Sequence, residues 1–491
     1  MEARAARSAR RERNMHVQTR LAMVALLLLL TPSFAGAQSA RSELERIARA
    51  MGATNLKSIE VTGGGVDYAV GQSVVPGAPW PRFNVTGFTR AADYQAGTLR
   101  DEYVRARADD PPRGGGVPTR GEQRVRMFMS GDYAWTVVND APVPAPITLA
   151  ERRFQLWASP HGVIKAALAN KATVKDRVIA FSIPGHMTMR ATVDRKRLVE
   201  HVHATIPNPV LGDLTIEVRY SDYKDFGGVK FPMKIEESAG GFPSADLTIT
   251  DVRPNAPIDV PVPEPVRQAA SPYAKVTSQK VADGVWYLTG GSHHSAVIEM
   301  SDHLIVVEAP LNDERALAVV AEARQLSPKP IKFVVNTHHH FDHAGGLRAI
   351  AGEGITILTH EVNRAFFSRV LAAPATVSPD HLAKSGQKGA VDGVRDRQVL
   401  GDGTREVTIH HIAGNAHHDG LLMVHLPREK LLIQADAFTP GPANAPPPTP
   451  PHPFSVNLAD NITRLGLDVD QLLPLHGRIV PLAELHRAVG R

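Results

Sequence analysis

The histidine-rich run that follows the apolar segment 331–335 is the part of the chain best suited to metal chemistry. The β-branched apolar segment predicts a buried strand that ends just before the run. His338 and His340 are two residues apart, so on extended backbone both imidazoles point the same way and can bind one ion. Asp342 and His343 lie beyond the bend and can bind a second ion close by. The pattern therefore predicts a metal site at a strand end.

The order His-x-His-x-Asp-His at the end of a strand resembles the signature of the metallo-β-lactamase superfamily, a family of metal-dependent hydrolases. The resemblance covers residues 276–491, where short apolar strands alternate with helices. It implies an αββα sandwich in an α+β protein, with two sheets packed face to face between outer helices. It also implies further ligands at later strand ends, which the chain supplies in order: His417, Asp436 and His476.

The resemblance divides these ligands between two ions. The first ion is expected on His338, His340 and His417, and the second on Asp342, His343 and His476, with Asp436 bridging both. The segment around His417 departs from the family's usual Gly-His-Thr turn, because two histidines stand side by side there. His417 is the expected ligand, and His418 is the alternative with a supporting role.

The donor set consists of imidazoles and carboxylates, because the chain contains no cysteine. This set favours two zinc ions per chain, with iron or manganese as alternatives. Two cations that share a water molecule lower its pKa, and the resulting hydroxide can attack a carbonyl or phosphoryl centre that the metal polarises. Asp342 is the candidate catalytic residue, expected to orient this hydroxide and to pass a proton to the leaving group.

Two positions narrow the resemblance within the superfamily. The β-lactamases of the family carry Cys or Ser where this chain has Asp436, so the aspartate points to glyoxalase-II-like, lactonase-like or phosphodiesterase-like relatives. The oxygen-reducing di-iron members carry Glu where this chain has His340. A third position, Glu308, stands where the family commonly has an aspartate that supports the site, and its role stays open.

Substrate contacts are less well defined than metal ligands. His293 and His294 lie on an early loop that the resemblance places near the mouth of the site. The proline-rich segment 440–453 follows the bridging aspartate and is expected to form a stiff wall of the pocket, with His452 as a candidate contact. His418 completes this group of candidates.

The N-terminus has the three parts of a secretory signal in residues 1–37. An arginine-rich start precedes the apolar run Leu21–Leu30, and small residues at 35–37 offer a cleavage site. Export to the periplasm or secretion is the expectation, with an uncleaved membrane anchor as the alternative. No apolar run is long enough for a stable span after the signal is removed. The signal carries six arginines and two glutamates, which leaves about +1 of the net +5 for the rest and predicts no nucleic-acid binding.

Three further segments follow from composition and alternation. Residues 38–254 predict a β-rich module with a curved antiparallel sheet and a helical stretch at 149–169, loosely similar to periplasmic lipoprotein-carrier folds. Its Gly- and Pro-rich segment 111–117 is expected to be mobile surface. Residues 255–275 are rich in Pro and Ala and predict a linker, and residues 276–491 form the catalytic domain.

Together these features predict an exported hydrolase that cleaves an ester, thioester, lactone or amide bond of a small molecule. One alternative is a periplasmic β-lactamase, which the compartment favours and Asp436 disfavours. An alternative of another class is a carrier protein whose N-terminal module holds a lipid-like ligand beside a subsidiary metal module. The substrate, the role of the N-terminal module and the oligomeric state stay open.

Overall fold

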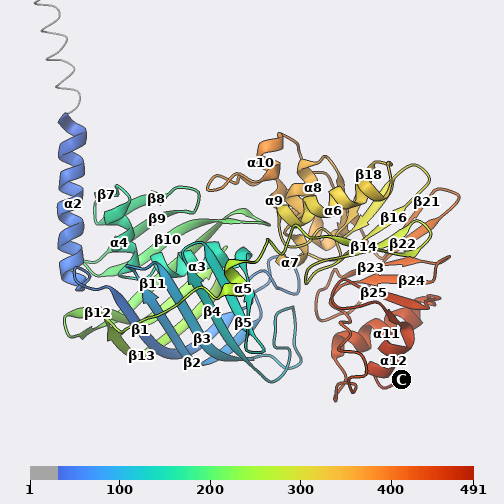
Figure 1. The fold of residues 1–491 in the computed structure, drawn as a ribbon, viewed down its shortest axis with the longest axis horizontal. Helices are drawn as coiled ribbons and strands as arrows, with labels where there is room; N and C mark the ends of the chain where they lie inside the picture. Colours follow the sequence, from blue (N-terminus) through green and yellow to red (C-terminus); the bar gives the residue numbers. More distant parts are fainter. Residues whose placement is uncertain (1–30) are drawn as a thin grey trace, which may run out of the picture.

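The computed structural model describes residues 31–491 in two modules that lie side by side along the long axis of the molecule (Figure 1). Most of the expected signal peptide lies outside the described residues. Its last residues belong to α2 (Thr31–Met51), a helix that continues past the expected cleavage point at 37. Among the described residues, no helix combines the length and apolar character needed to cross a membrane.

The N-terminal module is built on one antiparallel sheet, which confirms the expected β-rich fold. Its strands, in the part of the chain that the structure describes, follow the order β6-β5-β4-β3-β2-β1-β13-β12-β11-β10-β9-β8-β7. Their bounds are β1 (Ser58–Tyr68), β2 (Arg82–Asp93), β3 (Thr98–Arg107), β4 (Glu122–Ser130), β5 (Tyr133–Val138), β6 (Ala141–Pro144), β7 (Thr173–Lys175), β8 (Val178–Ile183), β9 (Met187–Val193), β10 (Val199–Asn208), β11 (Gly212–Phe226), β12 (Val229–Ala239) and β13 (Phe242–Pro254).

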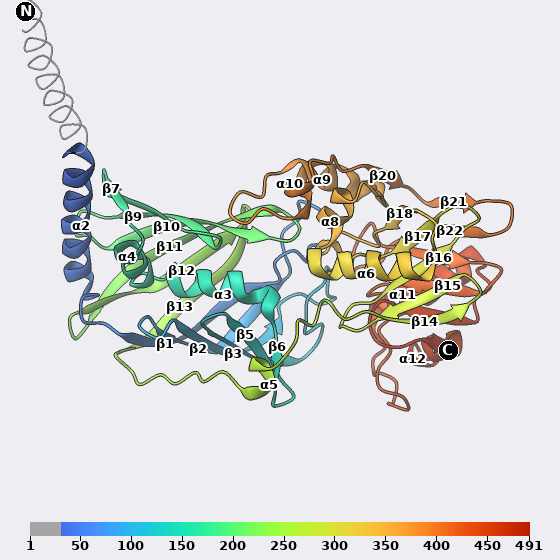
Figure 2. The same cartoon turned by 45° about the horizontal axis from the view of Figure 1, so that its top comes forward.

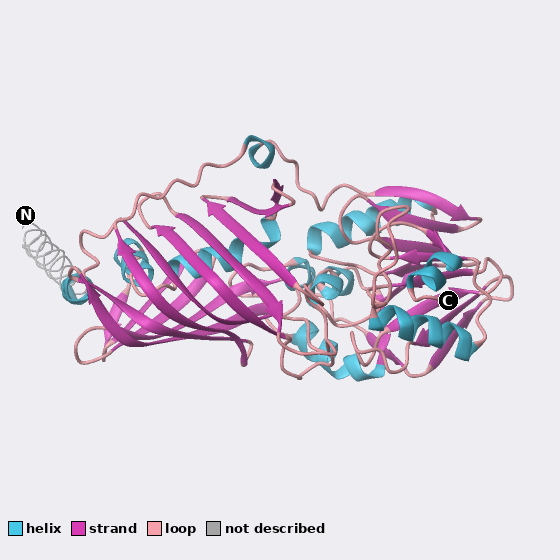
Figure 3. Ribbon diagram, turned by 90° about the horizontal axis from the view of Figure 1, so that it is seen from below, coloured by secondary structure: helices cyan, strands magenta, loops and turns pink. Residues whose placement is uncertain are grey.

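The sheet curves around two short helices, α3 (Leu149–Trp157) and α4 (Gly162–Ala169), as Figures 2 and 3 show. Helix α3 contacts β3, β4 and β5 as well as β10, strands that are far apart in the sheet order. The single helical stretch predicted at 149–169 is broken at 158–161. Pro160 explains the break, because it has no backbone N–H and disfavours helical backbone at the residue before it.

The linker packs against the N-terminal module along most of its length. It contains one helical turn, α5 (Glu264–Arg267), which contacts β5 and β6. Val260 and Val266 are buried together with Trp135 in a small apolar cluster. The segment predicted as a linker is therefore an ordered strut, held by apolar contacts on the edge of the sheet.

The C-terminal module is the αββα sandwich that the sequence predicts. One sheet follows the order β14 (Thr277–Ala282), β15 (Val285–Thr289), β16 (Ser295–Glu299), β17 (Leu304–Val307), β18 (Ile331–Val335), β19 (Thr356–His360) and β20 (Val391–Val394). The other follows β21 (Arg397–Gly401), β22 (Glu406–His411), β23 (Leu422–Leu426), β24 (Leu431–Gln434), β25 (Gln471–Pro474) and β26 (Val480–Pro481). Apolar side chains from both sheets form the central core between them.

Helices cover the outer faces of this sandwich. The first sheet packs on α6 (Asp313–Leu326), α8 (Leu347–Gly352) and α9 (Glu361–Ala372), and the second on α11 (Pro453–Leu465) and α12 (Leu482–Ala488). Two further short helices, α7 (Phe341–Ala344) and α10 (His381–Ser385), lie in connections. Strands β17, β18 and β19 are parallel, as are β24 and β25. Their carboxyl ends meet at the edge of the sandwich that faces the N-terminal module (Figure 1).

Candidate metal centre

The histidine loop leaves the centre of the first sheet and is anchored by buried polar side chains. Strand β18 ends at Val335, and Asn336 then donates from Nδ2 to Glu308 Oε1 at 3.0 Å. His340 has extended backbone, with φ −55° and ψ 142°, after which α7 turns the chain back. The loop therefore presents His338 and His340 before the turn, and Asp342 within the turn.

One group of side chains matches the ligands expected for the first ion. His338, His340, His417 and Asp436 offer ligand atoms that all lie within 4.8 Å of one another. The Nε2 atoms of His338 and His417 are 3.2 Å apart, and Asp436 Oδ2 lies 3.3 Å and 3.2 Å from them, respectively. Both histidines of the His-x-His pair are fully buried.

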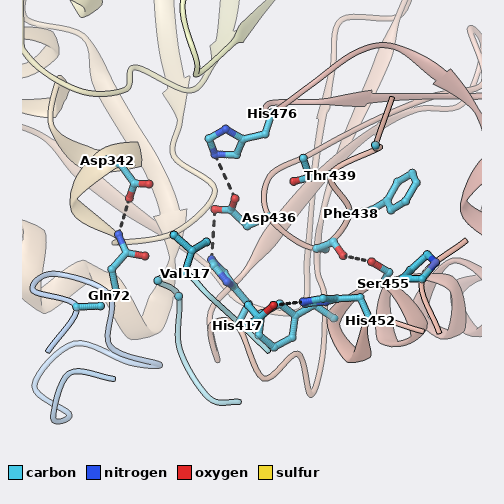
Figure 4. A pocket seen from close by; sticks show the side chains of 18 of the residues that line it. Gln72, Val117, Asp342, His417, Asp436, Phe438, Thr439, His452, Ser455 and His476 are labelled. Carbon is cyan, nitrogen blue, oxygen red and sulfur yellow. Dashed lines mark hydrogen bonds and ion pairs between the residues drawn. The ribbon is translucent and has the colours of Figure 1, made fainter. Parts of the chain in front are cut away.

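A second group lies directly beside the first. His343 Nε2 is 3.0 Å from His476 Nε2, and these atoms lie 2.8 Å and 3.1 Å from Asp436 Oδ2 and Oδ1. Asp342 Oδ2 is 3.9 Å from His343 Nε2. Asp436 therefore contacts both groups, which is the bridging place that the sequence assigns to it. Figure 4 shows this carboxylate between His417 and His476.

The other ring nitrogens of these histidines face hydrogen-bond acceptors, which fixes how the rings point. His343 Nδ1 lies 3.1 Å from Glu308 Oε2, and His476 Nδ1 lies 3.0 Å from the carbonyl oxygen of Ser292. His340 Nε2 lies 2.9 Å from the carbonyl oxygen of Ser73, so it carries the proton and donates. Its Nδ1 then presents a lone pair that is buried without a partner.

This arrangement fits divalent metal ions. A buried imidazole nitrogen with no partner is costly unless something binds it, and neutral imidazole is the form that binds metals. Burial, reinforced by the nearby His343, lowers the pKa of His338 to about 3. Burial likewise keeps the pKa of His340 well below its ordinary value. Both rings are therefore neutral at neutral pH and ready to coordinate.

The carboxylates make the same centre attractive to cations. Burial would raise the pKa of Asp436, but His343 and His476 outweigh it and hold the pKa well below the ordinary range. Burial would lower the pKa of His343, but Asp436 and Asp342 outweigh it and raise the pKa well above the ordinary value. A proton on His343 thus supplies the positive charge that the buried anions require, and a metal ion would displace it.

Glu308 supports the centre from behind. The side chain is fully buried, and its backbone has φ +71°, an uncommon conformation for a residue other than glycine. Its carboxylate accepts hydrogen bonds from Asn336, from the hydroxyl of Thr337 and from His343 Nδ1. The residue that departs from the family's usual aspartate therefore still orients a candidate ligand.

The centre opens into a cavity of about 980 Å³, lined by both modules. The end of the cavity nearest the candidate ligands, which we call the metal end, is formed by Asp342, His417, Asp436 and His476 (Figure 4). Part of the proline-rich segment predicted as a wall does line the cavity, as do these residues of the N-terminal module: Asp67, Tyr68, Gln72, Tyr103, Arg105, Val117, Met127 and Glu151.

The four predicted substrate contacts have different places. His452 lines the cavity, with Nε2 3.2 Å from Thr119 Oγ1. His293 belongs to the second group of possible ligands, with Nε2 3.2 Å from Asp342 Oδ2, and it does not line the cavity. His294 and His418 do not line the cavity either, which corrects the expectation for all three residues.

The surroundings of His294 and His418 explain the correction for these two residues. The ring of His294 packs against Tyr287, with centroids 5.2 Å apart. His418 is fully buried, 2.5 Å from His339 Nδ1 through Nε2, and its Nδ1 accepts from the N–H of Gly420 at 2.8 Å. Both nitrogens of His418 are therefore occupied, and the geometry favours His417 as the ligand.

The N-terminal module contributes contacts that the sequence patterns do not indicate. Gln72 donates from Nε2 to Asp342 Oδ1 at 2.8 Å. The segment 111–117, expected to be mobile surface, has buried residues at Gly114 and Gly115 and packs against the centre. Three consecutive glycines were the available signal, since glycine permits close backbone approach as well as flexibility.

The family model of the metallo-beta-lactamase superfamily matches residues 288–474. The chain is 25% identical over 207 residues to the 2,4-dinitroanisole O-demethylase subunit alpha of a Nocardioides species, covering 41% of this chain and 57% of that protein. It is 40% identical over 57 residues to the linear primary-alkylsulfatase of a Pseudomonas species, which is 12% of this chain and 11% of that protein.

Solved structures similar to this chain include metallo-β-lactamases from Pontibacter korlensis and Hirschia baltica. The sequence identities are 16% and 19%, and each match covers 44% of this chain with a TM-score of 0.34. The matches cover 98% and 96% of those two proteins.

Proposed function

Residues 288–474 form a metallo-β-lactamase superfamily domain, and from this premise we propose that the chain is a dinuclear metal-dependent hydrolase of small organic molecules. The observation that carries the proposal is the place of Asp436, whose two oxygens contact two adjacent groups of ligand atoms at the end of a large cavity. An anion in this place is suited to bridge two cations. The imidazole and carboxylate donors favour zinc.

The proposed ligands are those that the sequence predicts. One ion would be held by His338, His340 and His417, the other by Asp342, His343 and His476, with Asp436 shared. When bound, two such ions would lower the pKa of a water molecule and polarise the bond to be cleaved.

Asp342 is the proposed proton carrier. It lines the cavity, and Gln72 and His293 hold its two carboxylate oxygens in place. An ionised carboxylate at this position can take a proton from water at the metal end of the cavity and return it to a leaving group. Burial would raise its pKa, but His343 and His293 outweigh that effect and keep the pKa well below its usual value, so the base form is present at neutral pH.

The cavity is large enough to hold a substrate of the size of a drug molecule. Its volume of about 980 Å³ lies near the upper end for small-molecule sites. Val117, Phe438 and the prolines 446–448 provide apolar wall around the metal end. We propose that the bond cleaved is an ester, thioester, lactone or amide, because Asp436 stands where the β-lactamases of the family carry Cys or Ser.

The carrier alternative receives less support. The cavity that enters the N-terminal module is continuous with the metal end, and Asp67, Arg105 and Glu151 line it there. A lipid-like chain would have to bury against these charged groups, which is unfavourable. The export that forms part of the proposal is supported by the sequence of residues 1–37. Cell fractionation followed by N-terminal sequencing tests it, with a periplasmic chain that begins at Gln38 as the expected result and an uncleaved chain in the membrane or cytoplasmic fraction as the contrary result.

Metal content and turnover test the proposed function together. Wild-type protein reconstituted with zinc should hold about two ions per chain, and Asp436→Ala should lower the content of both. His203→Ala serves as the control, since His203 lies on β10 of the other module. A chain that stays metal-free, or an Asp436→Ala variant with full metal content and turnover, would contradict the proposal.

The substrate panel separates the bond classes. p-Nitrophenyl butyrate and a thioester probe the proposed class, nitrocefin probes β-lactam cleavage, and dodecyl sulfate probes the primary alkyl sulfate chemistry named for the alkylsulfatase relative. Ester or thioester turnover that Asp436→Ala lowers by more than about 100-fold would support the proposal, since that exceeds the usual loss from a supporting contact. Turnover confined to nitrocefin or to the sulfate would assign the chain to another class.

A further inference from the structure

A short segment of the N-terminal module, residues 69–75, lies directly on the histidine loop. We call it the docking segment. The N–H of Phe341 donates to the carbonyl oxygen of Gly71 at 3.2 Å. The ring of Phe341 fills the space where a Cβ at Gly71 would stand, and Gly71 has φ +78°. Only glycine therefore combines this backbone conformation with this contact.

The docking segment also contacts the second ligand loop. The N–H of Asp419, two residues beyond His417, donates to the carbonyl oxygen of Val74 at 2.8 Å. The hydroxyl of Ser73 lies 3.2 Å from His339 Nε2, the ring that holds His418 on its other side. The segment is thus joined to both loops that carry ligands of the first ion.

Two contacts of this segment reach candidate ligands themselves. The carbonyl oxygen of Ser73 accepts from His340 Nε2, which leaves Nδ1 as the coordinating atom. Gln72 donates to Asp342 Oδ1, so that Oδ2 faces the other members of the second group, 3.2 Å from His293 Nε2 and 3.9 Å from His343 Nε2. A carboxylate with one oxygen held by an amide donor cannot rotate freely about its last torsion. Each contact therefore determines which possible ligand atom, of His340 or of Asp342, faces the candidate metal centre.

A second loop of the N-terminal module fixes Gln72 in turn. The N–H of Gly115 donates to the carbonyl oxygen of Gln72 at 2.9 Å. A Cβ on Gly115 would stand 2.1 Å from Gln72 Oε1 and 2.9 Å from the ring of His340, closer than packed atoms approach. The adjacent Gly114 donates to the carbonyl oxygen of Ala416 at 2.8 Å. The fit between the modules is therefore tight at the ligands.

We propose that the N-terminal module contributes to the metal centre by positioning two of its ligands. Gln72 is the positioning residue for Asp342, and the carbonyl group of Ser73 positions His340. The inference rests on the proposed function in so far as His340 and Asp342 are ligands. Supporting contacts of this kind typically change metal affinity 10- to 100-fold. The module would then set the affinity of the centre besides shaping the cavity.

The experiment measures metal affinity on the full chain, so it does not depend on any substrate. Gln72→Met keeps the length of the side chain and removes the donor, and Gln95→Met makes the same change at an exposed site. Zn²⁺ affinity is measured by competition with a chelator, and the Co²⁺-substituted protein gives a ligand-field spectrum. Gln72→Met should weaken one of the two metal equivalents about 10- to 100-fold and shift the spectrum, while Gln95→Met matches wild type.

Gly115→Ala provides a second, steric test. It should weaken both equivalents, because the added methyl presses on Gln72 and on His340. Gly401→Ala is the matched control, since its Cβ would meet only ordinary contact. Wild-type affinity and spectrum in Gln72→Met would overturn the proposal, even if Gly115→Ala failed to fold. Wild-type protein that binds metal with the expected dependence on Gln72 but cleaves nothing in the panel would refute the proposed function alone.

Discussion

Replacing Glu308 by glutamine should weaken the centre without touching a ligand. The carboxylate is surrounded by donors: Oε1 accepts from Asn336 Nδ2 at 3.0 Å and from the N–H of Thr337 at 3.4 Å. Oε2 accepts from the hydroxyl of Thr337 and from His343 Nδ1 at 3.1 Å. Glutamine has the same shape but only one oxygen, so its amide group must face donors in either orientation.

The size of the effect follows from this conflict. If the amide group takes the Oε2 position it faces His343 Nδ1–H, and if it takes the Oε1 position it faces Asn336 and the Thr337 N–H. A buried donor left without an acceptor costs about 1–3 kcal/mol. The free energy of unfolding should fall by about 2 kcal/mol or more. Zinc affinity of the group that contains His343 should fall about 10- to 100-fold, because the ring loses its charged acceptor.

Chelator competition and urea unfolding of the zinc-loaded protein measure the two quantities. Glu406→Gln is the control, because Glu406 is a half-exposed member of a 3.7 Å surface ion pair with Arg397, and such pairs contribute little. A Glu308→Gln variant with wild-type zinc affinity would refute the view that the carboxylate orients His343. Glu308→Asp should be intermediate, since it keeps the charge but is one methylene too short to reach every donor.

Three further predictions follow from other contacts. Arg348→Ala breaks a buried ion pair with Asp380 and the hydrogen bonds to two backbone carbonyl oxygens. It should therefore lower the free energy of unfolding by about 3–5 kcal/mol in urea titrations. Arg369→Ala, at an exposed position, is the control and should change this free energy by less than about 1 kcal/mol. Burial lowers the pKa of His161 from 6.5 to about 4, so the unfolded chain binds the extra proton first. Stability should fall by roughly 3 kcal/mol as pH drops from about 6.5 to about 4, and the slope in that range should be smaller in His161→Gln. His417→Ala should lose about one metal ion by mass spectrometry, and His418→Ala should keep both; the reverse result would exchange their roles.

The positions of the candidate ligands were predictable because each is a local feature of the chain. His338, Asp436 and His476 each follow an apolar strand of four or five residues, and parallel strands bring their carboxyl ends to one edge. The αββα sandwich was predictable because the same alternation of strands and helices resembles that of the metallo-β-lactamase superfamily.

The supporting contacts were not predictable, because no periodicity encodes them. Gln72 and Asp342 are 270 residues apart in the chain, and nothing in the sequence around Gln72 distinguishes it from a surface polar residue. The glycines at 114–116 are compatible with a mobile loop and with a close approach of backbone to a neighbour. Only the packing against His340 distinguishes these two interpretations. Contacts that arise when two folded modules meet are properties of surface shape.

The ordered linker favours a fixed arrangement of the two modules, which the proposed shared centre requires. A hydrogen bond such as that of Gln72 to Asp342, at 2.8 Å, weakens steeply once the partners separate beyond about 3.2 Å. A flexible tether would let the modules sample many separations and would oppose such contacts by the entropy lost on docking. Here Val260 and Val266 of the linker pack against Trp135 of the N-terminal module. Much of the conformational entropy of the linker is therefore already lost when the chain folds. The ordered linker therefore favours the same arrangement of the two modules that the contacts of Gln72 and Ser73 require, and the geometry of the proposed metal centre would depend on both modules.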